Sequence, residues 1–238
     1  MCQRGSGVTI DKGKLKAAGI QGRMASFISG GVPVRIDQQE PAAPGRHPAI
    51  LLLHGSGGNV GFWFDRVAPQ LGRLNLGLYA AHYFNRTGTI RADRDTILDG
   101  YHFPTWLATI MDALKYLRSR PSVDPDRVAL LGVSLGAFLA LGLATDKAAR
   151  IRAVVEISGG VPEPAIGGIT SDYPPTLIIH GDADTVVPVT MAHQLEGLLK
   201  QCSVPHQALI LPGQGHWFDA GAQLRILMTT AGFLARHL

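Results

Sequence analysis

A serine flanked by glycines occupies the segment 132–136, which has the spacing Gly-x-Ser-x-Gly. The segment lies between an apolar run typical of a strand, residues 127–133, and one typical of a helix, residues 135–145. A serine on such a sharp strand-to-helix turn exposes its hydroxyl at the edge of a sheet, and the glycines let neighbouring backbone pack closely. The helix N-terminus also favours the negative charge that develops during attack. We therefore predict that Ser134 is a nucleophile and favour this over a purely structural glycine-rich turn.

A serine hydroxyl is a weak nucleophile at neutral pH and needs a general base. His216 is the candidate, because it lies on a glycine-rich turn between the last predicted strand and the last predicted helix. A histidine base needs a carboxylate that fixes its tautomer. The turn after residues 176–180 offers two, Asp182 and Asp184. We favour Asp184, because it lies farther past the strand end, and we expect Asp182 to brace the turn.

Backbone N–H groups are the expected partners of the oxyanion that forms when a serine attacks a carbonyl. The N–H of Leu135, directly after the nucleophile, is one candidate. The second is expected from the glycine-rich loop 54–58, at Ser56 or, as the alternative, at Gly57. This loop lacks the Gly-Lys-Ser/Thr of a phosphate-binding loop, and we find no dinucleotide-binding fingerprint. The sequence therefore predicts no nucleotide cofactor.

Short apolar runs alternate with segments of helical periodicity along the chain. We predict strands at residues 32–37, 49–54, 76–81, 127–133, 153–157, 176–180 and 206–211, and helices at 61–71, 104–118, 135–145, 189–201 and 220–238. The alternating segment 32–37 is typical of an edge strand. The whole pattern predicts an α/β fold with a doubly wound, mostly parallel sheet and helices on both faces. The candidate residues all follow strands, where such sheets bind ligands.

The composition limits the class of protein further. Of the 238 residues, 46% are hydrophobic and 17% charged, which is an ordinary globular mixture. The net charge of +4 falls entirely on residues 1–23. We therefore expect a basic, disordered tail at residues 1–23, a single catalytic domain at 24–238 and no nucleic-acid partner. The two cysteines, Cys2 and Cys202, exclude a disulfide scaffold and a cysteine-rich zinc site, and we expect no metal.

The expected cellular location and the candidate pocket residues follow from simpler features of the sequence. No apolar run is long enough to span a membrane, and the first 30 residues lack the apolar core of a signal peptide. We expect a cytoplasmic monomer or homodimer without membrane partners. Tyr83, Phe103 and Trp217 are candidate walls of a substrate pocket. The connection 158–175 is too short and too rich in proline and glycine for a large helical lid.

Four segments of the chain resemble the dienelactone hydrolase family of the α/β-hydrolase fold. They are AILLLHGSGG at 49–58, VDPDRVALLGVSLGAFLAL at 123–141, PPTLIIHGDADTVVPV at 174–189 and LPGQGHWF at 211–218. The resemblance covers about residues 30–238. It implies the triad Ser134, Asp184 and His216, in the chain order of α/β hydrolases. It also implies cleavage of small carboxylic esters or lactones through an acyl-enzyme, with no metal or organic cofactor.

One departure from the family and three alternatives qualify this interpretation. Family members that open dienelactone carry a cysteine nucleophile, whereas this chain has Ser134. We therefore expect a serine esterase related to that family. A prolyl-oligopeptidase-like peptidase or an acyltransferase could use the same triad, although such a peptidase usually brings a gating domain. A non-catalytic ligand-binding protein of the same fold is the alternative from a different class.

Overall fold

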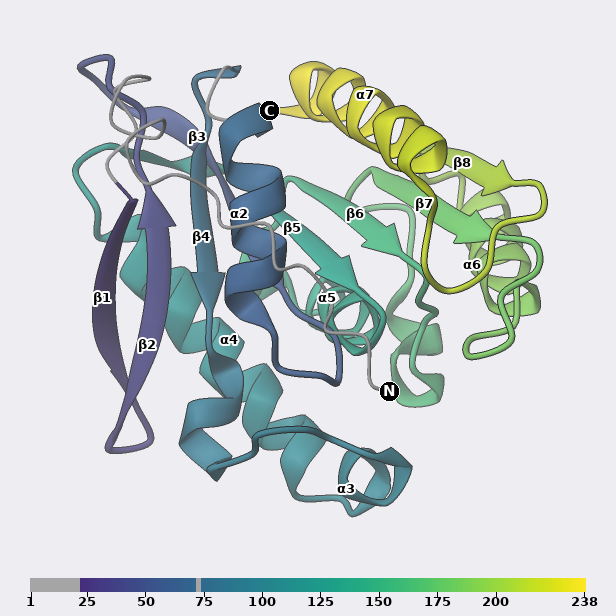
Figure 1. The fold of residues 1–238 in the computed structure, drawn as a ribbon, viewed down its shortest axis with the longest axis horizontal. Helices are drawn as coiled ribbons and strands as arrows, with labels where there is room; N and C mark the ends of the chain where they lie inside the picture. Colours follow the sequence, from purple (N-terminus) through teal and green to yellow (C-terminus); the bar gives the residue numbers. More distant parts are fainter. Residues whose placement is uncertain (1–21, 72–73) are drawn as a thin grey trace, which may run out of the picture.

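The computed structural model describes residues 22–71 and 74–238 (Figure 1). Most of the predicted tail, residues 1–21, lies outside this part of the chain. Its last two residues, Gly22 and Arg23, belong to the first strand. That strand runs to Ser29 and pairs with the next one across the turn Gly30–Gly31, where both glycines have positive φ angles of 55° and 82°. Two consecutive glycines are a typical signal of a tight hairpin.

An eight-stranded sheet forms the centre of the molecule, with the order β1-β2-β4-β3-β5-β6-β7-β8. Its strands are β1 (Gly22–Ser29), β2 (Val32–Gln39), β3 (His47–Leu53), β4 (Gly77–Ala81), β5 (Val123–Val133), β6 (Ala153–Ile157), β7 (Thr176–Gly181) and β8 (His206–Leu211). β2 is antiparallel to both of its neighbours, and the pairs from β4 to β8 are parallel. The predicted α/β fold with a mostly parallel sheet is confirmed. The prediction of an edge strand at residues 32–37 is wrong, because β1 covers that side of β2.

The described residues form six α-helices, of which five lie between strands and α7 follows the last strand. They are α2 (Val60–Leu71), α3 (Arg94–Leu98), α4 (His102–Arg118), α5 (Leu135–Leu143), α6 (Thr190–Gln201) and α7 (Ala220–His237). Short 3-10 helices, η2 (Tyr83–Thr87), η3 (Lys147–Ala149) and η4 (Glu163–Gly168), lie in the connections. Between β6 and β7, η4 is the only helical segment, so this connection forms no large lid.

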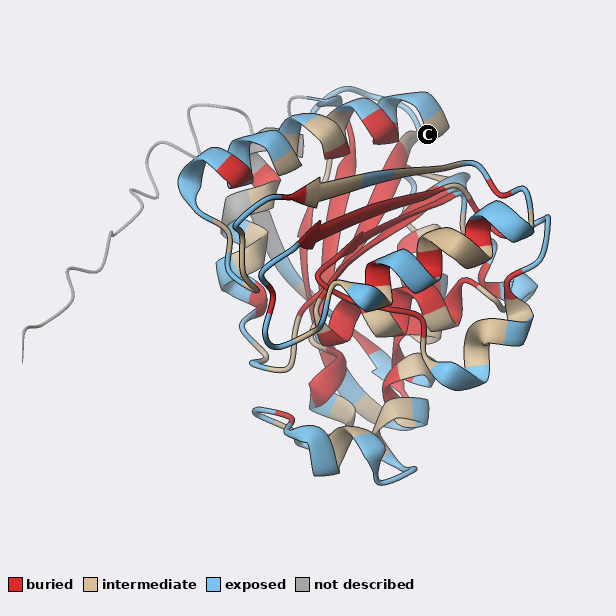
Figure 2. Cartoon of the chain, turned by 90° about the vertical axis from the view of Figure 1, so that its right-hand side faces the viewer, coloured by how far each residue is buried: buried red, intermediate tan, exposed pale blue. Residues whose placement is uncertain are grey.

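The helices divide between the two faces of the sheet (Figures 1 and 2). α4, α5 and α6 cover one face, which we call the closed face, and α2 and α7 lie on the other, the pocket face. Alternate residues of the central strands serve the two cores, as Leu130 of β5 faces the closed face and Leu131 the pocket face. The continuous apolar runs of these strands follow from this burial on both sides.

Candidate active site

Ser134 occupies a strained turn between β5 and α5. Its backbone angles, φ 53° and ψ −120°, are unusual for a residue other than glycine. The flanking glycines, Gly132 and Gly136, are needed because a side chain at either position would collide with neighbouring backbone. A Cβ atom at Gly132 would lie 2.2 Å from the carbonyl oxygen of Gly136, and one at Gly136 would lie 2.2 Å from the carbonyl oxygen of Leu53. The turn is therefore fixed by contacts between backbone atoms.

Three predicted residues meet in one chain of hydrogen bonds at the carboxyl ends of β5, β7 and β8. The hydroxyl of Ser134 donates to Nε2 of His216 at 3.1 Å. Nδ1 of His216 donates to Oδ2 of Asp184 at 2.7 Å. The tautomer follows from the carboxylate, which accepts a proton but has none to donate. This arrangement lets the imidazole take a proton from the serine.

Asp184 is held in its ionised form by its surroundings. Burial raises the pKa of this carboxyl, but the hydrogen bonds from the Val187 N–H, the His216 ring and the Val186 N–H outweigh it and leave the pKa below its usual value. The two N–H groups donate to Oδ1 at 2.8 and 2.9 Å, which leaves Oδ2 for His216. The carboxylate can therefore stabilise the imidazolium that forms during catalysis.

Asp182 braces the turn, as expected from its position. Its Oδ1 accepts a hydrogen bond of 2.7 Å from the N–H of Gly213, in the turn after β8. The N–H of Ala183 donates to the carbonyl of Gln214 at 3.0 Å. These two bonds tie the turn that carries Asp184 to the turn that carries His216.

The predicted oxyanion-hole segments lie next to Ser134. Leu135 is the first residue of α5, where an N–H has no acceptor within the helix. On the other side, a Cβ atom at Gly55 would lie 3.4 Å from Cβ of Ser134, so the loop 54–58 lies against the nucleophile. The carbonyl of Ser56 accepts a bond of 2.9 Å from Ala92, which anchors this loop. The roles of Leu135 and Ser56, and of Gly57 as the alternative, stay predictions.

Tyr83 is buried beneath the loop 54–58 and supports it, so the prediction that Tyr83 is a pocket wall is wrong. Its side chain is fully buried and donates a hydrogen bond of 2.6 Å to the carbonyl of His54. The rings of Tyr83 and His54 stack, with centroids 4.0 Å apart. Burial lowers the pKa of His54 to about 4, so its ring is neutral, and Nδ1 donates to the carbonyl of Gly55. His54 is thus a structural support of the loop.

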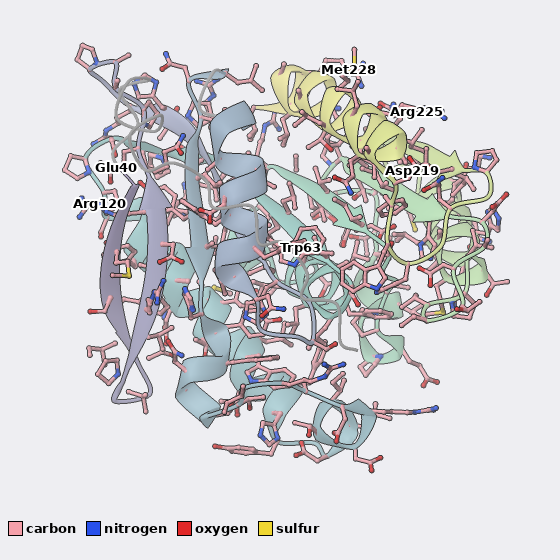
Figure 3. The ribbon with its side chains drawn as sticks, viewed as in Figure 1. Glu40, Trp63, Arg120, Asp219, Arg225 and Met228 are labelled. Carbon is pink, nitrogen blue, oxygen red and sulfur yellow. The ribbon has the colours of Figure 1, made fainter. Side chains whose placement is uncertain are left out.

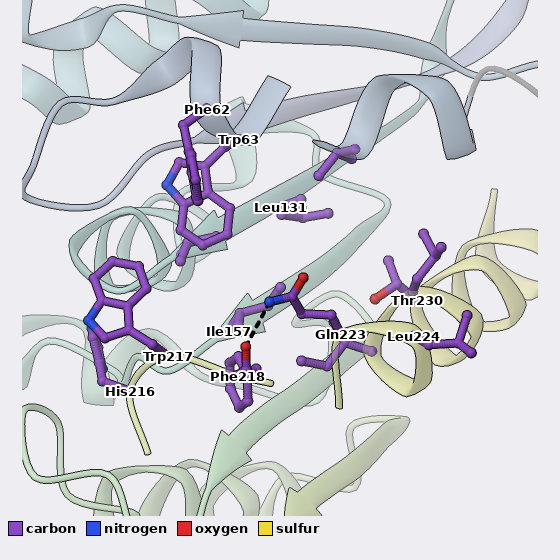
Figure 4. A pocket seen from close by; sticks show the side chains of 14 residues that line it. Phe62, Trp63, Leu131, Ile157, His216, Trp217, Phe218, Gln223, Leu224 and Thr230 are labelled. Atoms are coloured by element: carbon purple, nitrogen blue, oxygen red, sulfur yellow. Dashed lines mark hydrogen bonds between the residues drawn. The ribbon is translucent and has the colours of Figure 1, made fainter. Parts of the chain in front are cut away.

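A cavity of about 530 Å³ opens beside His216 on the pocket face (Figure 4). Trp217 lines this cavity, and its role as a wall of a substrate pocket stays a prediction. Phe103 does not line this cavity, and its partly buried side chain packs against the core of the closed face. Sequence analysis missed the remaining walls, which come from α2, the central strands and α7; they include Phe62, Trp63, Leu131, Ile157, Leu224 and Leu227.

The described residues show neither a metal centre nor a membrane span. Within residues 22–71 and 74–238, no group of three or more His, Cys, Asp or Glu side chains could hold a metal ion. No helix in the same ranges is long and apolar enough to cross a membrane.

The fold and the serine turn together are those of the α/β-hydrolase fold. The chain belongs to the dienelactone hydrolase family, whose family model matches residues 38–224. It is 26% identical over 191 residues to the protein Rv2307c of Mycobacterium tuberculosis, covering 72% of this chain and 64% of that one. It is 31% identical over 159 residues to the putative esterase NocK of Nocardia uniformis, covering 62% of this chain and 43% of NocK. The chain thus spans less than two thirds of these relatives.

A crystal structure confirms the fold. The dienelactone hydrolase-like promiscuous phosphotriesterase P91, from metagenomic libraries, superposes with a TM-score of 0.78 at 20% identity. The match covers 92% of this chain and 98% of P91. The family model confirms the sequence resemblance to the dienelactone hydrolase family, and the superposition with P91 confirms the α/β-hydrolase fold.

Proposed function

We propose that the protein is a serine hydrolase that cleaves carboxylic esters or lactones through an acyl-enzyme. The observation that carries the proposal is the hydrogen-bonded chain from Ser134 through His216 to Asp184. The strained turn presents the serine, the histidine can take its proton, and the carboxylate fixes the histidine. Membership in a hydrolase family and the similarity to an esterase-named relative support the same reaction.

The mechanism follows from these positions. Oγ of Ser134 attacks the ester carbonyl while Nε2 of His216 takes the hydroxyl proton. The negative charge moves to the carbonyl oxygen, where the N–H groups of Leu135 and Ser56 stabilise it. The intermediate collapses, His216 gives its proton to the leaving alcohol, and an acyl-serine remains. His216 then takes a proton from water, whose oxygen attacks the acyl group. As the bond between the acyl carbon and Oγ breaks, His216 returns the proton to Oγ, which releases the acid and the free serine. No step uses a metal or a cofactor.

The experiment combines covalent labelling with hydrolysis. A fluorophosphonate probe should label the wild-type protein at Ser134, and p-nitrophenyl acetate and a simple lactone test turnover. Ser134→Ala should remove labelling and lower kcat by a factor on the order of 10⁴–10⁶. Ser171→Ala changes an exposed serine outside the site and is the matched control, with labelling and kcat as in the wild type.

Three results would overturn the proposal. Equal labelling of the wild type and Ser134→Ala would show that another residue is the nucleophile. A wild-type protein that is folded but neither labelled nor active on any ester or lactone would be a ligand-binding member of the fold. Cleavage of peptides but not of esters would favour the peptidase alternative.

A further inference from the structure

The cavity beside His216 lies where the pocket face is not closed by helix packing. α2 and α7 stand apart over the carboxyl-terminal halves of β5 and β6, and Leu131, Val133 and Ile157 of these strands form its floor (Figure 4). Val133 directly precedes the nucleophile, and His216 is itself part of the wall. The cavity therefore borders the candidate base and the residue next to Ser134. Its volume of about 530 Å³ lies within the usual range of small-molecule sites.

The walls of this cavity are almost entirely apolar. Among the fourteen described residues that line it, none is Lys, Arg, Asp or Glu, and His216 is the only titratable group. Gln223 uses its amide nitrogen to donate to the carbonyl of Phe218 at 2.7 Å. The hydroxyl oxygen of Thr230 is buried and has no hydrogen-bond partner among the described residues. A carboxylate on a substrate would find no cation in these walls, and burying an unpaired charge is costly.

Aromatic rings form the side of the cavity nearest His216. The rings of Trp63 on α2 and Trp217 stack at 15°, with centroids 6.3 Å apart. Phe62 packs edge-on against Trp63 at 5.3 Å. Trp217 is 71% exposed although it is a large aromatic residue. Such planar walls can contact an aromatic ring or an alkyl chain that enters between α2 and α7.

We propose that this cavity binds an uncharged, bulky apolar part of the ester, namely an aromatic ring or a medium-length alkyl chain. The inference rests on the proposed ester hydrolysis and adds the substrate class. Each methylene that enters the cavity should raise kcat/KM about threefold to fourfold, the factor that corresponds to the transfer free energy of a buried methylene. The increase should end when the cavity is filled. Esters that carry a carboxylate on that part should be poor substrates.

The first test reduces the volume of the cavity by substitution and measures how kcat/KM depends on the length of the ester's acyl or alcohol part. p-Nitrophenyl esters of two to twelve acyl carbons vary the acyl part, and acetate esters of phenols and alcohols vary the other part. Leu227→Trp places a large ring on the α7 wall. Met228→Trp is the matched control, because Met228 is the next residue, is 67% exposed and lies outside the cavity (Figure 3). The filled variant should lose the preference for long or aromatic groups in at least one series and keep its rate on the smallest ester.

The second test changes the charge of the wall. Leu224 lines the cavity and is 58% exposed, so Leu224→Arg places a cation there at small cost to folding. This variant should raise kcat/KM for monoesters of dicarboxylic acids relative to neutral esters of equal length by about tenfold. Met228→Arg, on the outer side of α7, should keep the wild-type ratio (Figure 3).

The outcomes separate the inference from the proposed function. If both series of wild-type rates are flat with chain length, or if Leu227→Trp and Met228→Trp give the same profiles, the cavity does not select the substrate. In that case Ser134 is still labelled by fluorophosphonate and the smallest ester is still cleaved. Loss of both labelling and hydrolysis in the wild type would instead overturn the proposed function. If Leu227→Trp is not labelled by the fluorophosphonate probe, its unfolding is compared with that of the wild type. If the variant proves less stable than the wild type, Leu224→Arg provides the independent test of the cavity.

Discussion

The two faces of the sheet are built differently around the same central strands. On the closed face, α5 packs so tightly that the backbone at Gly136 meets the carbonyl oxygen of Leu53. On the pocket face, α2 and α7 leave a cavity beside His216, and Trp217 at its side is largely exposed. The difference suggests a division of roles. Backbone contacts on the closed face fix the nucleophile, and side chains on the pocket face contact the substrate.

This division has a physical basis. Atoms of the backbone cannot be changed by substitution, so a turn held by backbone contacts keeps its geometry while the surrounding sequence changes. Side chains such as Trp63 and Leu227 can be replaced one at a time. We therefore expect substitutions on the closed face and in the triad to change kcat or stability, and substitutions on the pocket face to change the choice of substrate.

The largest effect is expected at the junction of the two faces, in Asp184→Asn. The amide cannot stabilise an imidazolium and favours the wrong tautomer of His216, so kcat should fall by about 10⁴-fold. The ratio of rates between long and short esters should stay as in the wild type, because the cavity is unchanged. Steady-state kinetics over the ester series measures both quantities. A changed chain-length profile at unchanged kcat would break the proposed division of roles.

The second effect tests the tight backbone contact of the closed face. In Gly136→Ala the new Cβ atom would lie 2.2 Å from the carbonyl oxygen of Leu53 and 2.6 Å from that of His54. Neither oxygen can move without shifting the strand end, so we expect the free energy of unfolding to fall by at least about 3 kcal/mol. Denaturant unfolding of the two proteins measures the loss.

The matched control for this substitution lies on the pocket face. A Cβ atom at Gly232, inside α7, would have nothing within 4 Å beyond its own helix. Gly232→Ala should therefore stabilise the protein by about 0.5–1 kcal/mol, because alanine loses less conformational entropy in a helix. Equal destabilisation by both substitutions would show that the closed face is no tighter than the pocket face.

The residues of the candidate triad could be predicted from the sequence, because each of them lies in a local motif. Ser134, Asp184 and His216 each follow a recognisable strand, and the parallel sheet places all three turns at one edge. β1 was not predicted: residues 22 and 23 were assigned to a tail and residues 24–29 to no strand, although the two glycines after Ser29 are typical of a hairpin.

The cavity, in contrast, could not be read from local patterns. Its walls come from α2, two central strands and α7, which are far apart in sequence. The apolar residues Trp63 and Leu227 look like ordinary core positions of amphipathic helices. Whether such side chains meet a neighbour or leave a cavity depends on how far apart the two helices lie over the sheet. That distance is a property of the packed structure.

A third effect is expected from a buried acid on the closed face. Glu156 lies fully buried in β6, and burial raises the pKa of its carboxyl from 4.5 to about 8, against the hydrogen bond from Gly159. Between pH 4.5 and about 8, the carboxyl of Glu156 is ionised in the unfolded chain and protonated in the folded protein. The unfolded state then binds fewer protons, so stability should fall as the pH rises from about 4.5 to about 8 and stay low above it.

Glu156→Gln removes this titration while keeping the shape of the side chain. We expect little change in unfolding free energy at pH 5 and a gain of up to about 5 kcal/mol at pH 9, since the pKa rises from 4.5 to about 8 and each unit of pKa shift corresponds to about 1.4 kcal/mol. Thermal or denaturant unfolding at several pH values measures the difference. Parallel pH profiles of the two proteins would show that Glu156 is not protonated in the folded state.

The smallest effect is expected from the matching buried polar group of the pocket face. The hydroxyl of Thr230 is buried at the cavity wall and has no hydrogen-bond partner within residues 22–71 and 74–238, so Thr230→Val exchanges it for a methyl group of nearly the same shape. Removing an unsatisfied polar atom in this way is close to neutral or stabilising, and we expect a gain of up to about 1 kcal/mol. The more apolar wall should also raise kcat/KM for long-chain esters by less than about fivefold, with the smallest ester unaffected. A loss of more than about 1 kcal/mol would mean that the hydroxyl is bonded to water in the cavity, and the pocket face would then be less apolar than its side chains indicate.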